Sequence, residues 1–223
     1  MIALQASGLS FAYPGGKQLF CDVNLMVNEG ECVAVVGASG CGKSTLCLLL
    51  TGIIPRSIGG NIKGKVILYN DEAPSLALSV IVSRIGIVFQ DPDAQLFSST
   101  VEEEVAFGPE NLCLGREEIG KRIENSLEAV GMSEYRYFNP NDLSGGQKQL
   151  LALAAVLALS PRIIIFDEAF SQLDEESTVL VKNTVRLLKE QGKAILIIEH
   201  DRDNLDIADR IYSFENGRLQ ENV

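Results

Sequence analysis

Residues 32–50, CVAVVGASGCGKSTLCLLL, decide the fold of this chain. The first five of them are apolar and run into a glycine, a pattern typical of a strand buried on both faces. A glycine-rich loop follows and opens a predicted helix that extends to Leu50. Because a buried strand, a tight loop and a helix form the repeating unit of α/β proteins, this stretch predicts a sheet covered by helices.

The segments on either side continue the alternation of strands and helices. Short apolar runs predict strands, and apolar residues spaced by three or four predict amphipathic helices. The predicted strands are residues 66–68, 85–89, 163–166 and 194–198, and the predicted helices are residues 119–130, 147–159 and 175–190. This alternation indicates a mainly parallel sheet.

Three segments depart from the alternation. Turn signals within the first thirty residues predict small antiparallel strands. Asn216-Gly217, between two strand-like runs, predicts a hairpin near the end of the chain. The segment from about residue 97 to 159 is predicted to be a helical lobe inserted into the sheet. We therefore expect one α/β domain over residues 1–223, with a mainly parallel core, an N-terminal antiparallel β subdomain and an inserted α-helical subdomain.

Composition excludes several classes of protein. The net charge of -11 gives no basic footprint for non-specific nucleic-acid binding. The longest apolar run, residues 150–159, is about half of what a membrane-spanning helix needs. Lys17 is the first basic residue, so no secretory signal is expected. Five cysteines without a CxxC pair and a single histidine give no zinc site, and free thiols favour a cytoplasmic location.

The loop after the first buried strand carries the strongest chemical signal. Residues 37–45, GASGCGKST, match the phosphate-binding pattern GxxxxGK[ST] between a strand and a helix. Lys43 is expected to reach the β- and γ-phosphates of a nucleotide, and the Ser44 hydroxyl to bind Mg²⁺. A turn that only caps a helix is the alternative, but it does not explain the full motif. The candidate nucleotide-binding residues are Gly37, Ala38, Ser39, Gly40, Cys41, Gly42, Lys43, Ser44 and Thr45.

A second apolar strand, residues 163–166, ends in the carboxylates of Asp167 and Glu168. Asp167 is expected to hold Mg²⁺ and Glu168 to act as the base that activates the attacking water. A strand that ends in two acids is usually only a solvated strand end. The phosphate loop upstream is what favours the catalytic interpretation.

Residues 143–147, LSGGQ, open the next predicted helix. An ordinary helix cap explains Ser144 but leaves Gly145 and Gly146 unexplained, because consecutive glycines destabilise a helix start. A second phosphate contact explains them. The first loop already holds one side of the nucleotide. We therefore expect the second loop to bind the γ-phosphate of a nucleotide that is held by another copy of the chain, through Ser144, Gly145, Gly146 and Gln147.

The order of GASGCGKST, LSGGQ, FDE and IIEHD resembles that of ATP-binding-cassette (ABC) ATPases, over nearly the whole chain. The resemblance implies a P-loop NTPase core that uses ATP and Mg²⁺. It also implies roles for four further residues. Gln90 would contact Mg²⁺ and water and sense the membrane partner, and His200 would contact the γ-phosphate and support Glu168. Asp174 would lie at the dimer interface, and Tyr13 would stack on the adenine ring. Taken singly, each of these four residues also has an ordinary structural interpretation.

The sequence departs from the family pattern after Glu168. Ala169 stands where the family usually has proline, and residues 170–172, FSQ, replace Thr-Ser-Ala. These changes leave the catalytic groups in place, but they alter the residues that lead to Asp174.

Two longer stretches point to one branch of the family. Residues 89–112, FQDPDAQLFSSTVEEEVAFGPENL, and residues 52–66, GIIPRSIGGNIKGKV, resemble the ATPases of energy-coupling-factor (ECF) transporters and of cobalt and nickel uptake systems. The resemblance implies uptake of a vitamin or a transition-metal ion at the inner face of the cell membrane. The implied partners are a second cassette, a transmembrane coupling subunit and a substrate-binding membrane subunit.

Several alternatives stay open. The chain is compatible with a homodimer, a heterodimer, half of a tandem protein or a truncated protein, and the transported solute is not encoded. An ABC ATPase of DNA repair or translation is the main functional alternative. It is disfavoured because the segment from Lys43 to Ser144, whose ends are 101 positions apart, holds no coiled coil, and because a second cassette and a basic linker are absent.

Residues 91–118 contain eight acidic residues and one basic residue, a net charge of -7. Thr100 and Glu103 form a predicted capping box that uses one or two of these acids. We expect the others to dock onto basic cytoplasmic helices of a membrane partner. A solvated acidic face is the alternative.

Overall fold

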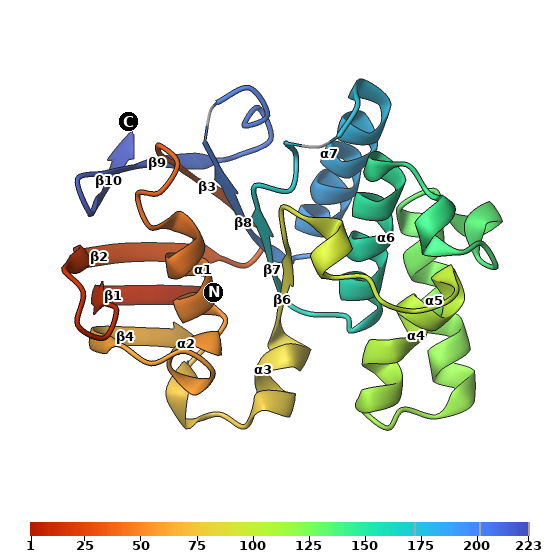
Figure 1. The fold of residues 1–223 in the computed structure, drawn as a ribbon, viewed down its shortest axis with the longest axis horizontal. Coiled ribbons are helices and arrows are strands. Elements are labelled where there is room, and N and C mark those ends of the chain that lie inside the picture. Colours follow the sequence, from red (N-terminus) through yellow and green to blue (C-terminus); the bar gives the residue numbers. More distant parts are fainter. Residues whose placement is uncertain (172, 201, 223) are drawn as a thin grey trace.

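The computed structural model describes residues 1–171, 173–200 and 202–222. Within these ranges the strands form two sheets, one antiparallel with the order β2-β1-β4-β5 and one mainly parallel with the order β10-β9-β3-β8-β7-β6. In Figure 1 the antiparallel sheet lies at one end of the molecule and a group of helices at the other, with the parallel strands between them. The predicted α/β class with a mainly parallel sheet is therefore confirmed.

The parallel sheet is the centre of the molecule. β3, β6, β7, β8 and β9 are parallel, and β10 returns antiparallel to β9 as the predicted hairpin. The strands are β3 (Cys32–Val36), β6 (Ile85–Val88), β7 (Ile163–Asp167), β8 (Ala194–Glu199), β9 (Arg210–Glu215) and β10 (Arg218–Asn222). Every residue of β3, β7 and β8 is buried, as expected for strands covered on both faces.

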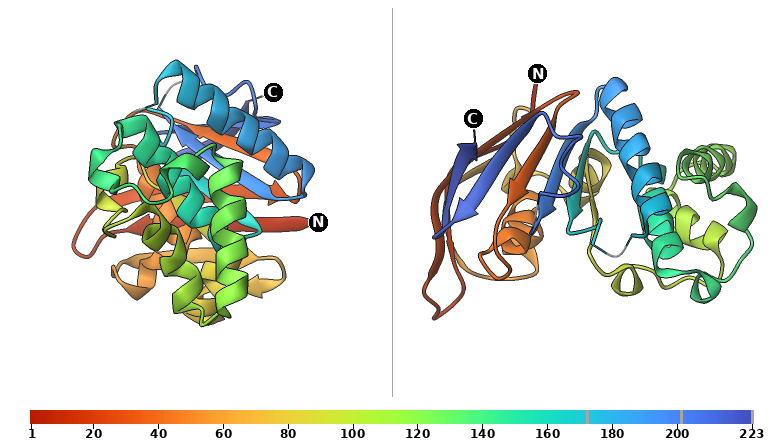
Figure 2. Two further views of the ribbon diagram at one scale, coloured as in Figure 1. Left: turned by 90° about the vertical axis from the view of Figure 1, so that its right-hand side faces the viewer. Right: turned by 90° about the horizontal axis from the view of Figure 1, so that it is seen from above.

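Alternate residues of these strands enter two different cores. Ala34, Ile164 and Ile197 face the helical side, whereas Val35, Ile165 and Ile198 face the antiparallel sheet and α1 (Lys43–Leu50). The view from above in Figure 2 shows this layering, with the parallel strands between the antiparallel sheet and α7 (Glu175–Glu190). The carboxyl edge of the parallel strands therefore lies between the two layers that complete the fold.

The antiparallel sheet is larger than the short strands that were predicted. It consists of β1 (Ile2–Ala12), β2 (Gln18–Asn28), β4 (Asn61–Leu68) and β5 (Asp71–Glu72). Residues 66–68, predicted as a strand of the alternating series, are the end of β4 and pair antiparallel with β1. The difference arises because a short apolar run does not reveal its pairing partner.

The helices after β6 pack together at the end of the molecule away from the antiparallel sheet (Figure 1). They are α4 (Val101–Asn111), α5 (Arg116–Ala129) and α6 (Gly145–Ala158), and α2 (Ile53–Arg56) and α3 (Leu78–Arg84) precede β4 and β6 respectively. Single-turn helices lie at η1 (Ala73–Ser75), η2 (Pro92–Ala94), η3 (Ser133–Tyr135) and η4 (Pro140–Asp142). Among the residues described, no helix has the length and apolar character needed to cross a membrane.

Candidate active site

The glycine-rich loop joins β3 to α1 at the carboxyl edge of the parallel sheet. Gly40 and Gly42 have φ angles of 77° and 110°, which favour glycine, and a Cβ on Gly37 would lie 2.6 Å from the Phe214 carbonyl oxygen. Gly42 precedes α1 without a side-chain cap, and the first turn of α1 holds no acid. The N–H groups at the start of α1 are therefore available to an anion.

Lys43 occupies the mouth of this loop. Its side chain is 3% exposed, and Nζ donates hydrogen bonds to the carbonyl oxygens of Gly37 at 2.7 Å and Ala38 at 3.1 Å. Nζ also lies 3.2 Å from Oε1 of Glu168. The ammonium group is thus held at the loop by groups that a phosphate could replace.

Ser44 and Asp167 meet from two different elements. The Ser44 hydroxyl donates to Oδ1 of Asp167 at 3.3 Å, and Asp167 is 6% exposed at the end of β7. Burial raises the pKa of Asp167, and the hydrogen bonds from Ser44 and from the buried Cys47 thiol oppose that rise. Burial also raises the pKa of Cys47 well above its ordinary value, so this thiol stays protonated as a donor.

Glu168 sits in an unfavourable backbone conformation, with a φ angle of 53°. Its N–H donates to the Ile198 carbonyl oxygen at 2.8 Å, and the Ser171 hydroxyl donates to the Glu168 carbonyl oxygen at 2.8 Å. Strained residues persist only where their surroundings fix them. Here neighbouring β8 and the turn itself hold Glu168 at the edge of the sheet.

A cavity of about 350 Å³ joins these groups. Tyr13 stands at its rim, 38% exposed, with its hydroxyl 3.0 Å from Oγ1 of Thr45 and its ring edge-to-face with Phe11 at 4.8 Å. Gln90, just after β6, also lines the cavity. The lining residues are Tyr13, Leu19, Ser39, Gly40, Gly42, Lys43, Ser44, Thr45, Gln90 and Glu168. The structure therefore brings most of the predicted phosphate, base and aromatic residues together.

His200 follows β8 and is not part of the cavity lining. Its side chain is 47% exposed, and Nδ1 lies 3.7 Å from Oε2 of Glu199. Gln172, in the altered segment before Asp174, lies outside the described residues, as does Asp201.

The LSGGQ segment begins α6 as a capping box. The Ser144 hydroxyl accepts the Gln147 N–H at 3.2 Å, and Oε1 of Gln147 accepts the Ser144 N–H at 2.9 Å. A Cβ on Gly146 would lie 2.8 Å from Oγ of Ser177, so packing against α7 already explains this glycine. Among the described residues, a Cβ on Gly145 would meet nothing within 4 Å. Packing within the chain therefore accounts for Gly146. Only Gly145 is left to be explained by the close approach of a group from outside the chain.

Asp174 caps the start of α7 beside this segment. Its carboxylate accepts the Ser177 N–H at 2.7 Å, and hydrogen bonds from the Ser177 backbone and side chain lower the pKa of Asp174. A Cβ on Gly146 would lie 3.5 Å from Oδ2 of Asp174. The starts of α6 and α7 are thus neighbours, and neither lines the cavity at the glycine-rich loop.

Three polar residues near the site were not predicted from the sequence. The buried Cys47 thiol, on α1, helps to lower the pKa of Asp167. Nε2 of Gln149, on α6, donates to the Phe89 carbonyl oxygen at 2.8 Å and so fixes the residue before Gln90. Glu199 is 2% exposed at the end of β8. Cys47 lies inside an apolar run, whereas Gln149 and Glu199 lie at the edge of one. The role of each depends on partners far away in the sequence.

The acidic segment is less exposed than its sequence indicates. Glu104 is 4% exposed, and its Oε2 accepts the N–H groups of Phe97 at 2.9 Å and Ser98 at 2.7 Å. Glu102 is paired with Arg136 at 2.5 Å. The predicted acidic surface therefore excludes Glu104, because this side chain stabilises the loop before α4.

An exposed patch nevertheless lies beside that loop. Phe97 and Phe107 are 65% and 47% exposed and stack edge-to-face at 4.6 Å. Glu103 lies one helical turn before Phe107 and is exposed, and Asp93 lines a small cavity with Phe97. We call Asp93, Phe97, Glu103 and Phe107 the aromatic–acidic patch.

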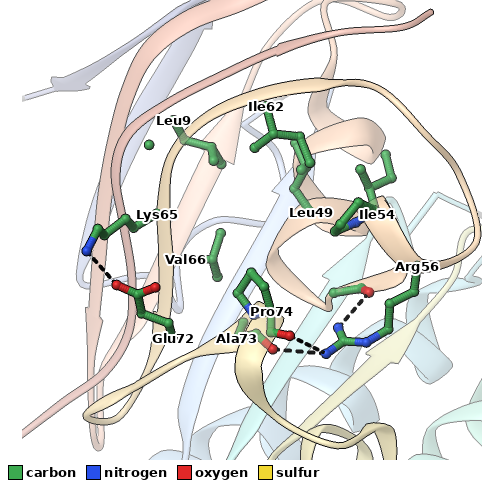
Figure 3. A pocket seen from close by; sticks show the side chains of 13 residues that line it. Leu9, Leu49, Ile54, Arg56, Ile62, Lys65, Val66, Glu72, Ala73 and Pro74 are labelled. Carbon is green, nitrogen blue, oxygen red and sulfur yellow. Dashed lines mark hydrogen bonds and ion pairs between the residues drawn. The ribbon is translucent and has the colours of Figure 1, made fainter.

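A second cavity, of about 70 Å³, lies between β4 and the α1–α2 segment (Figure 3). Its walls are mostly apolar, and Lys65 and Glu72 form an ion pair of 2.5 Å at its rim. Arg56 donates to the carbonyl oxygens of Gly52 at 3.0 Å and Leu76 at 2.7 Å, which ties α2 to the segment after η1. This cavity is too small for a nucleotide, and its charged groups are already paired.

Comparisons with known proteins identify the family of this chain. The family profile described as ABC transporter matches residues 20–171. A putative ABC transporter ATP-binding protein of Methanosarcina acetivorans is 44% identical over 97% of this chain, and the chain spans 34% of that protein's length. The energy-coupling factor transporter ATP-binding protein EcfA of the same organism is 41% identical over 97% of this chain and 77% of its own length.

A solved structure shows the same fold. The structure of cbiO1 from Clostridium perfringens, part of the ABC transporter complex cbiONQ, has a TM-score of 0.88 and 31% identity, and covers 98% of this chain and 87% of its own. With the profile match over more than half of its length, the chain belongs to the ABC transporter family as one of its ATP-binding cassettes.

Proposed function

We propose that this chain hydrolyses ATP to power a membrane transporter of the energy-coupling-factor type, which takes up a vitamin or a transition-metal ion. The observation that carries the proposal is the meeting of Lys43, Ser44, Glu168 and Gln90 around one cavity. The similarity to EcfA and to cbiO1 supports the transporter type.

The glycine-rich loop and Lys43 would bind the nucleotide phosphates. The N–H groups at the start of α1 favour phosphate oxygens, and Lys43 would exchange its contacts with the Gly37 and Ala38 carbonyls for the β- and γ-phosphates. Tyr13, at the rim of the cavity, would stack on the adenine ring.

The residues present also fit Mg²⁺. Ser44 and Asp167 already share a hydrogen bond, and a hydroxyl with a carboxylate is a donor set that Mg²⁺ prefers. In the described ranges no group of three or more His, Cys, Asp or Glu side chains could hold a metal ion alone, so the nucleotide phosphates would complete the site. Ser44, Asp167 and Gln90 would hold the ion, and it would neutralise charge on the phosphate oxygens.

Glu168 would act as the general base. Its carboxylate would accept a proton from the water that attacks the γ-phosphate, once phosphate has drawn Lys43 away from its contact at 3.2 Å. His200, half-exposed beside this turn, would contact the γ-phosphate. The hydrogen bonds that hold Glu168 in its left-handed conformation keep the base in place.

A second cassette would complete the site. No described residue lies within 4 Å of a Cβ placed on Gly145, and the start of α6 does not line the cavity of its own chain. Two cassettes arranged head-to-tail would let Ser144, Gly145 and Gly146 of each copy bind the ATP held by the other, with Gln147 holding the cap and Asp174 at the contact.

The membrane partner would dock at the aromatic–acidic patch, on the cytoplasmic face of the membrane. Residues 97–159, the proposed helical subdomain, carry three of its four members together with the LSGGQ segment. An exposed aromatic pair flanked by carboxylates suits a basic amphipathic helix of a membrane subunit.

The Glu168→Gln variant tests the hydrolysis and the shared site together. We expect it to bind MgATP, to lose turnover by about 10² to 10⁴, and to dimerise in MgATP but not in MgADP. Light scattering and a phosphate-release assay measure these effects, with mixing of candidate partner cassettes where the homodimer is weak. Unchanged turnover would exclude Glu168 as the base.

A further inference from the structure

Glu199 is a buried carboxylate that the proposed chemistry has not used. It is the last residue of β8, which lies between β3 and β7 in the middle of the parallel sheet (Figure 1). Its side chain is 3% exposed. Burying a carboxylate is costly unless hydrogen bonds or charges compensate, so the partners of Glu199 indicate what it does.

The contacts of Glu199 reach three parts of the candidate site. Its carbonyl oxygen accepts the N–H of Gly37, the first residue of the glycine-rich loop, at 3.3 Å. Its Oε1 accepts the N–H of Phe170, two residues after Glu168, at 3.3 Å. Its Oε2 lies 3.7 Å from Nδ1 of His200.

The turn that carries Glu168 needs such support. Glu168 has a φ angle of 53°, and the Ile198 carbonyl oxygen on β8 fixes its N–H at 2.8 Å. The next residue of β8, Glu199, fixes the other side of the turn through Phe170. Two consecutive residues of one rigid strand therefore hold both ends of the strained segment.

The contact with His200 is electrostatic, because 3.7 Å is too long for a hydrogen bond. A negative charge at this distance favours a proton on Nδ1 over a lone pair. The carboxylate would thus favour the tautomer with the proton on Nδ1 and bias how the ring is turned.

We propose that Glu199 is a positioning residue for ATP hydrolysis, which holds the Glu168 turn through Phe170 and orients the His200 imidazole by its charge. This inference rests on the proposed ATPase function. An apolar side chain would fill the same buried position, but it would make neither contact.

The Glu199→Gln variant separates the two contacts. Glutamine keeps an acceptor for the Phe170 N–H and removes the charge beside His200. We expect MgATP affinity to stay within about twofold and kcat to fall on the order of tenfold, the effect of losing one charge contact near 4 Å in a partly hydrated site. Glu199→Leu also removes the acceptor, and we expect it to lower kcat by about 10², the cost of a misplaced base.

The imidazole gives a second measurement that a purely structural role would not move. The chain has one histidine, so the ¹⁵N signals of a histidine-labelled sample belong to His200 alone. In Glu199→Gln we expect these signals to show less proton on Nδ1. In a His200→Ala background, the same Gln substitution should lower kcat less than it does in the wild type, because the contact with the imidazole that it weakens is already absent.

Glu104→Gln is the matched control, since Glu104 is also a buried glutamate that accepts backbone N–H groups, but on α4. It should lower thermal stability without changing kcat or the imidazole signals. If Glu199→Gln keeps wild-type kcat and imidazole signals, or loses affinity as much as kcat, the inference is overturned. A wild-type chain that hydrolyses no ATP, even with its partner cassette, would instead overturn the proposed function. Should Glu199→Leu fail to fold, Glu199→Gln in the wild-type and His200→Ala backgrounds still tests the inference.

Discussion

The two adjacent glycines of α6 give opposite expectations when each is changed to alanine. In the part of the chain that the structure describes, a Cβ on Gly145 meets nothing within 4 Å, whereas one on Gly146 would lie 2.8 Å from Oγ of the buried Ser177. Alanine favours a helix over glycine by up to ~1 kcal/mol, so Gly145→Ala should leave the free energy of unfolding unchanged or raise it by up to that amount. Gly146→Ala should lower it by about 1–2 kcal/mol, because overpacking outweighs the helix preference.

For Gly145→Ala we expect turnover to fall although the free energy of unfolding does not. If a phosphate of the second copy approaches the Gly145 N–H, a methyl group there would displace it by about 1 Å, and such a displacement lowers turnover by about 10². Gly145→Ala should therefore be stable and nearly inactive. Adding Ser177→Ala to Gly146→Ala removes the atom at 2.8 Å, leaves Cβ at 3.4 Å and should recover part of the lost stability.

Urea denaturation gives the free energies, and phosphate release at saturating MgATP gives the turnover. A stable Gly145→Ala variant with wild-type turnover would refute the argument that the start of α6 binds a phosphate. A Gly145→Ala variant destabilised by more than about 1 kcal/mol would refute the open environment on which the comparison depends.

Three further variants test other parts of the structure. Lys43→Ala removes the buried ammonium at the loop mouth, so MgATP affinity measured by calorimetry should fall at least tenfold, and unchanged affinity would contradict the assigned role. Asp93→Lys with Glu103→Lys should weaken co-purification with membrane subunits at low salt, while Glu117→Lys, an exposed acid on α5, should not. The hydrogen bond from Lys182 lowers the pKa of Asp206 below 3.8, so its contribution to stability is present above that pH and is lost as the pH falls through the lower folded value. Wild type should accordingly be more stable than Asp206→Asn at pH 6 in thermal unfolding, and the difference should shrink on acidification below about pH 4.

The sequence predicted those helices, strands and turns that are determined by residues close together in the chain. The apolar run of β3, the glycine-rich loop and the start of α1 occupy consecutive residues, so their spacing was sufficient. α7 was predicted at its observed bounds because its apolar spacing and the glycine after it are both continuous in the chain. The terminal hairpin followed from Asn216-Gly217 for the same reason.

What sequence could not supply were the partners across the fold. Residues 66–68 were predicted as one more strand of the alternating series, and only the pairing of β4 with β1 places them in the antiparallel sheet. Glu104 is one of three consecutive glutamates that the sequence does not distinguish, yet the folding of the preceding loop buries it. A glycine at position 146 would be attributed to a ligand on sequence alone, but the packing of α7 beside it already requires a residue without a side chain.

The same distinction explains why the candidate site depends on strand order. Lys43 and Glu168 are 125 residues apart in the chain, and their contact at 3.2 Å exists because β8 pairs with both β3 and β7. β8 contributes no predicted ligand of its own, but its Ile198 carbonyl fixes Glu168 and its Glu199 carbonyl fixes Gly37. A change that shifts β8 along the sheet would therefore move the phosphate loop and the base together. A change at either loop alone would leave the other in place, because each is anchored separately to this strand.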